Sequence, residues 1–405
     1  MIQAPESELS LPDGPAAVLA INGGSSSLKF ALYAPHLTLS GKIERIGLSN
    51  PTFSWNRSGG KGVNKAPVVA ASHSDALELL ERLIQNEGVA PVLLGVGHRI
   101  VHGGPHNTTP RRITPELLDE LQQLRPFSPE HLPAQLQLID GVSSRFPETP
   151  QIACFDTTFH AEMPIVAQTL AIPRRYHREG VRRYGFHGLS YEFIMEELIR
   201  LDGENAARRR LILAHLGNGA SLAAVRDGRS IDTSMGFTPT AGVPMSTRSG
   251  DLDPGLFLYL HQREGMSAEA FHTMVNKQSG LLGVSEISSD LRDLLASEAT
   301  DTRAAEAVEL FCYQIKKWIG AFTAVLGGLD SLVFTGGIGE NCIIVRDRVC
   351  RGLNHLGIEL DPARNEQNTA IISKSGTPVR VRVIRTDEEQ MIARAVRRIL
   401  KPLPC

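Results

Sequence analysis

The stretch "INGGSSSLKF", residues 21–30, decides the fold class of this chain. It follows the apolar run 16–20 and returns at once to apolar residues, which predicts a buried strand, a tight glycine turn and a second strand. The two-residue period of a strand places Ser25, Ser27 and Lys29 on one face and apolar side chains on the other. This polar, cationic face suits a phosphate group, and a plain glycine hairpin with a polar outer face explains it equally well.

Short apolar runs bounded by Gly, Asn or Asp alternate with longer segments of helical period along the whole chain. Strands are expected at 16–21, 27–33, 92–97, 151–156, 211–216, 220–225 and 331–335. Helices are expected at 75–86, 115–124, 190–201, 303–326 and 387–399. This alternation predicts an α/β protein.

Two further glycine-rich turns follow predicted strands, "HLGNGAS" at 215–221 and "FTGGIGEN" at 334–341. The hexapeptide that ends at Leu28, Gly-Gly-Ser-Ser-Ser-Leu, resembles Gly-Asn-Gly-Ala-Ser-Leu ending at Leu222, which indicates two related halves. Asn-Gly and Asp-Gly pairs also favour type I′ hairpins, so a simple meander explains the second region as well. Three such turns in one chain favour a nucleotide site.

The composition is that of a soluble globular protein of two ordinary domains, with 405 residues, 42% of them hydrophobic, and a net charge of −2. No block of like charge indicates a nucleic-acid or membrane surface. The five cysteines lack Cys-x-x-Cys spacing, which argues against disulfides and structural zinc and indicates a cytoplasmic protein. Residues 1–15 have no apolar signal segment and are expected to form a flexible extension.

Polar residues next to these strands and glycines are the candidates for chemistry. Two loop arginines, Arg99 and Arg248, could bind carboxylate or phosphoryl oxygens as a pair, and either could be a solvated charge instead. Asp156 ends a predicted strand, which is a usual position for a catalytic carboxylate in an α/β fold. Its side chain could instead form an Asx turn. His187 could donate a hydrogen bond to a ligand, or it could simply be a histidine in a turn. Glu388 is explained by its position as an acidic residue in the first turn of a predicted helix.

Two features have simpler structural explanations. Asp251 and Asp253 resemble a metal pair, but Asp253 followed by proline is typical of a helix N-terminus. His215 fits a satisfied strand histidine as well as a ligand.

Together these segments resemble the acetate kinases, of the acetate and sugar kinase, heat-shock chaperone and actin superfamily. The resemblance covers about Val18 to Arg398 and rests on ten motifs in order. These are "NGGSSSLKF", "GHRIVHGG", "FDTTFH", "RRYGFHG", "HLGNGAS", "DTSMGFTP", "TRSGDLDPG", "SGLLGVSEISSDLRD", "FTGGIGEN" and "TDEE".

The resemblance implies two actin-like, ribonuclease H-like lobes of mixed sheet with flanking helices and an interdomain ATP cleft. The expected N-terminal lobe is 16–156 with 390–405, and the expected C-terminal lobe is 157–389. The implied reaction is reversible, in-line transfer of the γ-phosphoryl group of ATP to acetate, with Mg²⁺, or Mn²⁺ as the alternative. Family members are homodimers, so a homodimer is expected.

The resemblance also assigns site residues. Arg99 would orient the carboxylate, Arg248 and His187 would stabilise the transferring group, and Asp156 would act in catalysis and help to organise the metal. Metal ligands would be Asn22 and Glu388. The substrate side would also include Val101, Phe186, Pro239 and His131. The nucleotide side would include Ser25, Ser27, Lys29, His215, Gly217, Asn218, Gly219, Asp290, Arg292, Gly336, Gly337, Gly339 and Asn341.

The chain departs from the family pattern at a few positions. Leu189 and Tyr191 stand where relatives have Thr and His, after His187. Glu130 aligns with the leucine of the apolar acyl pocket, where an ionised carboxylate would be unstable and would repel the substrate. The simplest expectation is that Glu130 turns away from the pocket.

Other functions also explain these motifs, some within the class of carboxylate kinases and one outside it. A kinase for propionate, butyrate or a more polar carboxylate explains the same motifs. From another class, an actin-like or chaperone-like ATPase would use hydrolysis to change shape. The paired arginines and "RRYGFHG" favour an acceptor site, because an ATPase needs no carboxylate clamp.

Overall fold

The computed structural model describes residues 16–24, 26–60, 62–87 and 93–400, and they fall into two compact units. The first unit contains the chain up to Val101, then Thr109–Phe155, and the C-terminal part from Glu389. The second contains His102–Thr108 and Asp156–Glu388. The predicted lobe boundaries placed Asp156 in the first lobe and Glu389 in the second, and did not separate the loop 102–108. The expected extension 1–15 and the candidate Ser25 lie outside the described residues.

Within the described residues, the strands of the first unit form one eight-stranded mixed sheet, in the order β5-β4-β3-β2-β1-β6-β8-β7. The strands are β1 (Ala17–Gly23), β2 (Ser27–Tyr33), β3 (Leu37–Glu44), β4 (Thr52–Arg57), β5 (Gly62–Pro67), β6 (Leu93–Ile100), β7 (Arg111–Arg112) and β8 (Gln151–Phe155). Its helices are α1 (His73–Asn86), α2 (Pro115–Gln123), α3 (Leu132–Arg145) and α15 (Glu388–Leu400). Helix α15 begins at the last residue of the second unit.

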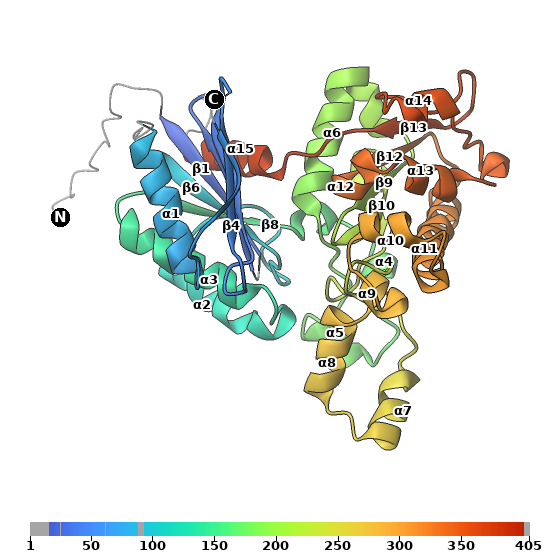
Figure 1. Ribbon diagram of the computed structural model, residues 1–405, viewed down its shortest axis with the longest axis horizontal. Coiled ribbons are helices and arrows are strands. Elements are labelled where there is room, and N and C mark those ends of the chain that lie inside the picture. The colour runs from blue at the N-terminus through green and yellow to red at the C-terminus, as the bar shows by residue number, and fades with distance from the viewer. Residues whose placement is uncertain (1–15, 25, 61, 88–92, 401–405) are drawn as a thin grey trace, which may run out of the picture. The chain divides into compact units, whose positions relative to one another are not determined.

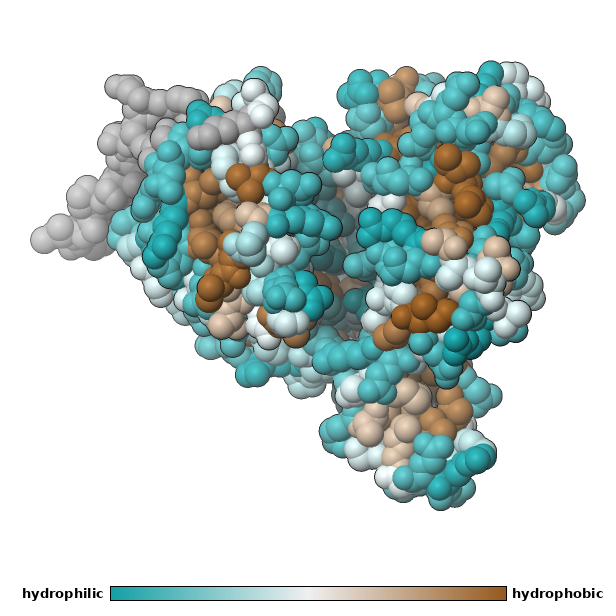
Figure 2. Space-filling view, viewed as in Figure 1, coloured by the Kyte–Doolittle hydropathy of each residue, from teal (hydrophilic) through white to brown (hydrophobic). Residues whose placement is uncertain are grey.

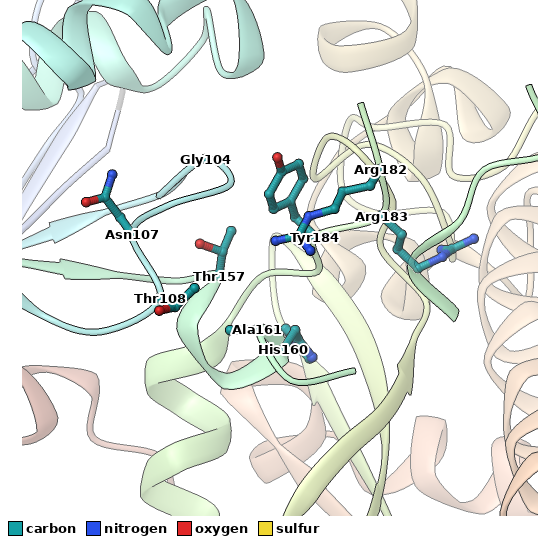
Figure 3. A pocket seen from close by; sticks show the side chains of 9 residues that line it. All are labelled: Gly104, Asn107, Thr108, Thr157, His160, Ala161, Arg182, Arg183 and Tyr184. Carbon is teal, nitrogen blue, oxygen red and sulfur yellow. The ribbon is translucent and has the colours of Figure 1, made fainter. Parts of the chain in front are cut away.

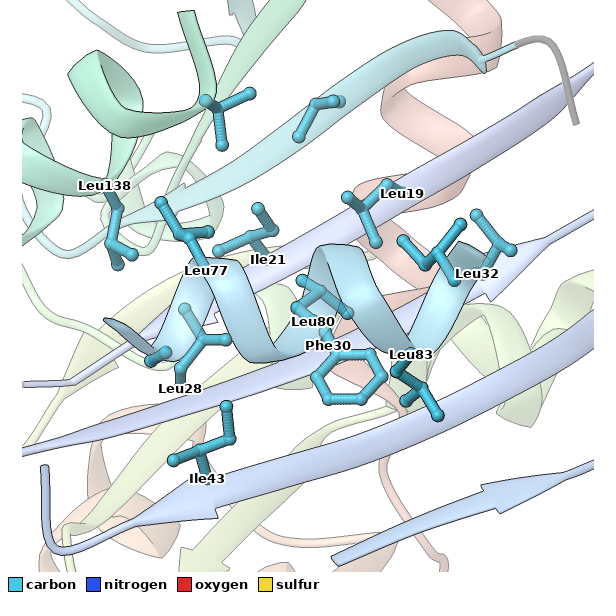
Figure 4. Packing of buried hydrophobic residues seen from close by; sticks show 14 of the residues in the cluster. Leu19, Ile21, Leu28, Phe30, Leu32, Ile43, Leu77, Leu80, Leu83 and Leu138 are labelled. Carbon is cyan, nitrogen blue, oxygen red and sulfur yellow. The ribbon is translucent and has the colours of Figure 1, made fainter. Parts of the chain in front are cut away.

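Helices cover both faces of this sheet (Figure 1). On one face, leucines of α1 and Leu138 of α3 pack on Leu28 and Phe30 of β2, as Figure 4 shows. On the other face, α15 packs so closely that a Cβ at Gly97 of β6 would lie 2.3 Å from Cγ2 of Ile392. A glycine in this strand therefore lets the helix approach the sheet.

The second unit is built on a five-stranded mixed sheet, in the order β11-β10-β9-β12-β13, as far as its residues are described. The strands are β9 (Leu211–Leu216), β10 (Ala220–Arg226), β11 (Arg229–Thr233), β12 (Ser331–Thr335) and β13 (Arg380–Val383). Strands β9, β10 and β11 are antiparallel, and β12 and β13 run parallel to β9. Strands β3-β2-β1-β6-β8 have the same order and directions, so the two sheets share one topology, which supports the predicted pair of related halves.

The helices of the second unit are α4 (Ile165–Gln168), α5 (Arg174–Arg178), α6 (Gly188–Asp202), α7 (Gly255–Glu264), α8 (Ala268–Lys277), α9 (Gly280–Ser285), α10 (Leu291–Ser297), α11 (Thr302–Leu326), α12 (Gly336–Asn341), α13 (Ile343–Cys350) and α14 (Pro362–Glu366). Helix α6 packs Ile194 and Leu198 on Leu211 and Leu213 of β9. Strand alternation directs the residues between them to the opposite face, and α11 contacts the sheet as well.

The structure confirms the predicted α/β class, and each predicted strand and helix is present within three residues of its expected bounds. One turn prediction was right: Asp227 and Gly228 both have positive φ, as a type I′ turn requires. The predicted turn at Gly217-Asn218-Gly219 also joins β9 to β10, but it is not of type I′, because Asn218 and Gly219 do not have positive φ. The "FTGGIGEN" segment, expected as a turn, contains the short helix α12.

No helix among the described parts of the chain combines the length and the apolar composition needed to cross a membrane.

Candidate active site

The first glycine turn joins β1 to β2 in the first unit. The backbone amide of Gly24 donates to the Ser27 carbonyl at 2.8 Å, and His73 Nε2 donates to the Gly24 carbonyl at 2.9 Å. On β2, Leu28 is buried while Lys29 is exposed and Ser27 is half-buried. Strand β2 therefore buries its apolar side chains and exposes its polar ones at this end, as predicted.

Asn22, at the end of β1, lies beside Arg99 of the neighbouring strand β6. Arg99 Nη1 donates to Asn22 Oδ1 at 3.0 Å, and Asn22 Nδ2 donates to Glu389 Oε1 at 3.3 Å. Asn22 also pairs with Lys29 across the hairpin. The structure thus brings three sequence candidates, Asn22, Lys29 and Arg99, to one end of the sheet.

Two other first-unit candidates belong to the segment before α3 or to the end of β6. Val101 is buried, and its backbone amide donates to Gln135 Oε1 at 3.1 Å. His131 is the N-cap residue of α3 and is half-buried. Glu130, directly before it, is also half-buried.

In the second unit, two glycine turns lie side by side because they follow the neighbouring parallel strands β9 and β12. Thr335 pairs with His215 at the ends of these strands. A Cβ at Gly217 would lie 3.9 Å from the backbone nitrogen of Gly337, and Gly336 has a φ of 76°. Asn218 accepts at its carbonyl from the Ser246 amide at 3.2 Å, which ties the first turn to the loop that carries Arg248.

His187, Arg248 and Pro239 gather around Gly219. A Cβ placed on Gly219 would lie 3.2 Å from His187 Nε2 and 3.5 Å from Arg248 Nη1. Arg248 Nη1 also donates to the Pro239 carbonyl at 3.1 Å. The absence of a side chain at Gly219 therefore lets a histidine, an arginine and the backbone of a glycine turn approach one another, an arrangement suited to an anion.

His187 is held in a conformation that few residues other than glycine adopt, with a φ of 61° as the N-cap of α6. Its Nδ1 atom lies 2.8 Å from Ser221 Oγ, and Ser221 Oγ lies 2.5 Å from Tyr191 Oη. The ring stacks on His215, with centroids 4.2 Å apart and planes at 21°. On the far side of that stack, Ser190 Oγ lies 2.8 Å from His215 Nδ1.

Asp156 is fully buried directly after β8, and its carbonyl accepts from the Gly188 amide at 2.8 Å. A Cβ at Gly188 would lie 2.3 Å from that carbonyl oxygen, so the start of α6 requires glycine there. Glu388 lies at the start of α15. The preceding Thr386 amide donates to Glu340 Oε1 at 3.1 Å.

Glu340 connects three parts of the second unit. Its Oε1 atom also accepts from the Gly336 amide at 3.0 Å and from Thr335 Oγ1 at 3.4 Å. Asn341, a nucleotide-side candidate, donates from Nδ2 to the Gly337 carbonyl at 2.9 Å, within α12. Arg346 is fully buried and donates to the Gly339 carbonyl at 2.9 Å, so the glycine segment is fixed at both ends.

Asp290 and Arg292 pair with each other at the start of α10. The Asp290 side chain accepts from the Arg292 amide at 2.9 Å, and Arg292 Nη2 lies 2.5 Å from Asp290 Oδ2. The guanidinium holds the pKa of the Asp290 carboxyl below its usual value. These contacts are local to α10 and do not join the two residues to the glycine turns.

Phe186 is buried, and its ring makes an edge contact with His102, at a centroid distance of 5.5 Å. Its carbonyl accepts from His160 Nε2 at 3.1 Å. Burial lowers the pKa of His160 to about 4, so this histidine is neutral at pH 7.

A small cavity lies nearby in the second unit, between the loop 102–108 and the segment 182–184. Figure 3 shows Gly104, Asn107 and Thr108 on one side and Arg182, Arg183 and Tyr184 on the other. Its volume of about 10 Å³ accommodates about one water molecule. It is therefore too small to hold a carboxylate substrate.

Sequence reasoning did not single out Ser190, Ser221, Glu340 or Arg346. Ser221 is the last residue of the quoted motif "HLGNGAS", so strand alternation from His215 was the available signal. Arg346 carried no signal in the sequence, because an arginine is rarely fully buried.

The family model described as "Acetokinase family" matches residues 17–394. The acetate kinase of Methylocella silvestris is 44% identical over 392 residues, which cover 93% of this chain and 96% of that protein. The propionate kinase of Citrobacter rodentium is 43% identical over 390 residues, which cover 94% and 96%.

Solved structures give the same result. The acetate kinase of Porphyromonas gingivalis has a TM-score of 0.85 at 37% identity, covering 95% of this chain and 100% of that one. The propionate kinase of Francisella tularensis has a TM-score of 0.88 at 35% identity, covering 94% and 98%. The mixed sheets are therefore those of the actin-like fold, and the chain belongs to the acetokinase family.

Proposed function

We propose that this enzyme transfers the γ-phosphoryl group of ATP to acetate, forming acetyl phosphate and ADP reversibly. Relatives at 42–44% identity that span nearly the whole chain and are named acetate kinase support this reaction. The motifs that carry the resemblance are spread over both units.

The observation that carries the proposal is the arrangement around Gly219. Phosphoryl transfer requires positioning and neutralisation of charge more than covalent chemistry. The Nε2 atom of His187 and the Nη1 atom of Arg248 both approach the position that a Gly219 side chain would occupy. We assign His187 and Arg248 to the equatorial oxygens of the transferring group.

The remaining roles follow the sequence expectations. We assign Arg99 to the substrate carboxylate, with Val101 and His131 in the same unit and Phe186 and Pro239 in the other as further substrate residues. The residues assigned to the nucleotide are Ser25, Ser27, Lys29, His215, Gly217, Asn218, Gly219, Asp290, Arg292, Gly336, Gly337, Gly339 and Asn341. In the second unit the adjacent glycine turns after β9 and β12 support this assignment.

Magnesium is the metal that we propose, because Asn22 and Glu388 offer oxygen atoms, the ligands that Mg²⁺ prefers. Among the described residues, no group of three or more His, Cys, Asp or Glu side chains is arranged to hold a metal ion by itself. Mg²⁺ is usually bound by one or two protein oxygens together with phosphates and water, so this is the expected pattern. We assign Asn22 and Glu388 as ligands, with Asp156 organising the site. The bound ion would neutralise charge on the phosphates.

The acceptor is tested by measuring acyl hydroxamate formation with MgATP across acetate, propionate, butyrate and a hydroxylated carboxylate. Acetate should give the highest kcat/KM. Propionate is the second candidate, because the chain is 43% identical to a propionate kinase. A higher kcat/KM for propionate would replace acetate in the proposal but retain the reaction class.

We also propose that the enzyme acts as a homodimer in the cytoplasm. Exposed apolar side chains on and beside α7, Leu252 and Leu258 among them, support association, and Figure 2 shows apolar residues on this part of the second unit. Among the described residues, Cys312, Cys342 and Cys350 take part in no disulfide, which suits a reducing compartment. Light scattering during size-exclusion chromatography tests the dimer.

A further inference from the structure

The hydrogen bonds around His187 form a chain whose proton positions can be deduced. The chain runs from the backbone amide of His215 to Tyr191 Oη, then to Ser221 Oγ and to His187 Nδ1. Tyr191 and Ser221 are both completely buried, so their hydroxyl protons need protein acceptors.

The contacts of Tyr191 fix which atoms donate in this chain of hydrogen bonds. Its oxygen accepts from the His215 amide, and burial raises the pKa of the phenol, so the hydroxyl keeps its proton. If Ser221 donated to Tyr191, the phenolic proton would have no acceptor among the residues that the structure describes, at a cost of about 1–3 kcal/mol for a buried group. Tyr191 therefore donates to Ser221.

The direction then continues to His187. Ser221 Oγ already accepts from Tyr191, and its own proton is directed to the remaining partner, Nδ1 of His187 at 2.8 Å. A proton on Nδ1 would leave two donors facing each other. His187 Nδ1 is therefore an acceptor, and the ring proton lies on Nε2, the atom next to Gly219.

The surroundings of the ring also disfavour a second proton. His215 stacks on His187 at 4.2 Å, and two imidazolium rings would repel each other at this distance. The Nη1 atom of Arg248 approaches the same Gly219 position as His187 Nε2, so a fixed positive charge lies close by.

We propose that Tyr191 and Ser221 are positioning residues that hold His187 as a neutral imidazole with its proton on Nε2, so that His187 donates a hydrogen bond to the transferring phosphoryl group. The catalytic consequence rests on the proposed function, but the tautomer is a property of the protein without substrate.

The tautomer is read from long-range ¹H–¹⁵N correlation spectra of the ¹⁵N-labelled enzyme near pH 8. The His187 signals are those that His187→Gln removes from the set of 13 histidines. We expect a single neutral form with an unprotonated Nδ1. An Nδ1-protonated form, an imidazolium or a mixture of tautomers in the wild type would overturn the proposal.

Two serine variants separate the role of Ser221 from general effects of substitution. Ser221→Ala should leave His187 exchanging between both tautomers. Ser190→Ala is the matched control, because Ser190 is equally buried and makes a hydrogen bond of the same 2.8 Å length to the other ring, His215. It should leave the His187 signals unchanged. A His187 tautomer unaffected by Ser221→Ala, or equally affected by Ser190→Ala, would refute the assignment.

Kinetics then connect the tautomer to turnover. Ser221→Ala should lower kcat for acyl phosphate formation about tenfold, and Tyr191→Phe about threefold, with KM for ATP changed less than twofold. A rise in KM at constant kcat would contradict a role in the transition state. If the wild type forms no acyl phosphate, the proposed function fails, while the spectra still decide the tautomer.

Discussion

Gly219→Ala is the most informative small change, because it adds one methyl group where His187 and Arg248 approach the turn. The new Cβ would lie 3.2 Å from His187 Nε2, 3.4 Å from Cε1 and 3.5 Å from Arg248 Nη1. The first contact requires the histidine or the turn to shift by a few tenths of an ångström. The methyl group would also occupy space next to the two side chains that are proposed to donate hydrogen bonds to the phosphoryl group.

The expected decrease in kcat of Gly219→Ala follows from these distances. A misplacement of about 1 Å in an active site costs about 10²-fold in rate, so a smaller shift together with a partly blocked position should lower kcat about 10- to 100-fold. The fold should survive, because φ of Gly219 is outside the left-handed region and alanine reduces the entropy of the unfolded chain.

The hydroxamate assay and thermal unfolding measure the two effects separately. Gly217→Ala is the comparison on the same turn, since its Cβ would meet atoms only at ordinary contact distances, 3.4 Å from the Gly219 carbonyl oxygen and 3.8 Å from His215 Nε2. It should lose less than tenfold in kcat. If Gly219→Ala keeps kcat within threefold of the wild type, or loses no more than Gly217→Ala, the phosphoryl group does not pass Gly219.

Steady-state kinetics should separate the arginines: Arg248→Ala should lower kcat about 10²- to 10³-fold, and Arg99→Ala should raise KM for the carboxylate more than for ATP. Near-normal kinetics in both variants would refute the roles assigned to the two arginines. Glu130→Leu should barely change KM for acetate, since we expect Glu130 to turn away from the substrate, and a tenfold gain in kcat/KM would show that it faces the acyl group. Burial lowers the pKa of His98 and of His160 to about 4, below the unfolded value of about 6.5. The unfolded state therefore binds more protons as the pH falls through this window, and the free energy of unfolding should decrease from pH 6.5 to 4 by up to about 1.4 kcal/mol per pH unit for each histidine. Equal urea midpoints at pH 7.5 and 5 would contradict this.

The elements that could be predicted are those whose signal is local. Strands β1, β9 and β12 are nearly continuous apolar runs that end in, or are followed by, glycine or a polar residue, so their ends are visible in the sequence. The Asp227-Gly228 turn was predictable because both residues tolerate positive φ. The candidate site followed from motifs at the ends of such strands.

The elements that were missed depend on distant partners. Strand β13, "RVRV", has no apolar run, and it forms by parallel pairing with β12, while Asp202 pairs with its arginines, Arg380 at 2.9 Å and Arg382 at 2.6 Å. Helix α12 arises in a sequence that favours a turn, because Glu340 binds its first amide and the buried Arg346 binds its last carbonyls. Polar edge strands such as β5 bury little and give no hydrophobic period.

Phosphoryl transfer to a carboxylate is the reaction that we propose for this enzyme. The direct measurement is the ratio of acetyl hydroxamate to ADP formed from MgATP, with and without acetate. We expect ADP formation to depend on acetate and the two products to appear in equal amounts. ADP release at the same rate without any carboxylate, and without hydroxamate, would contradict this reaction and favour a conformational ATPase.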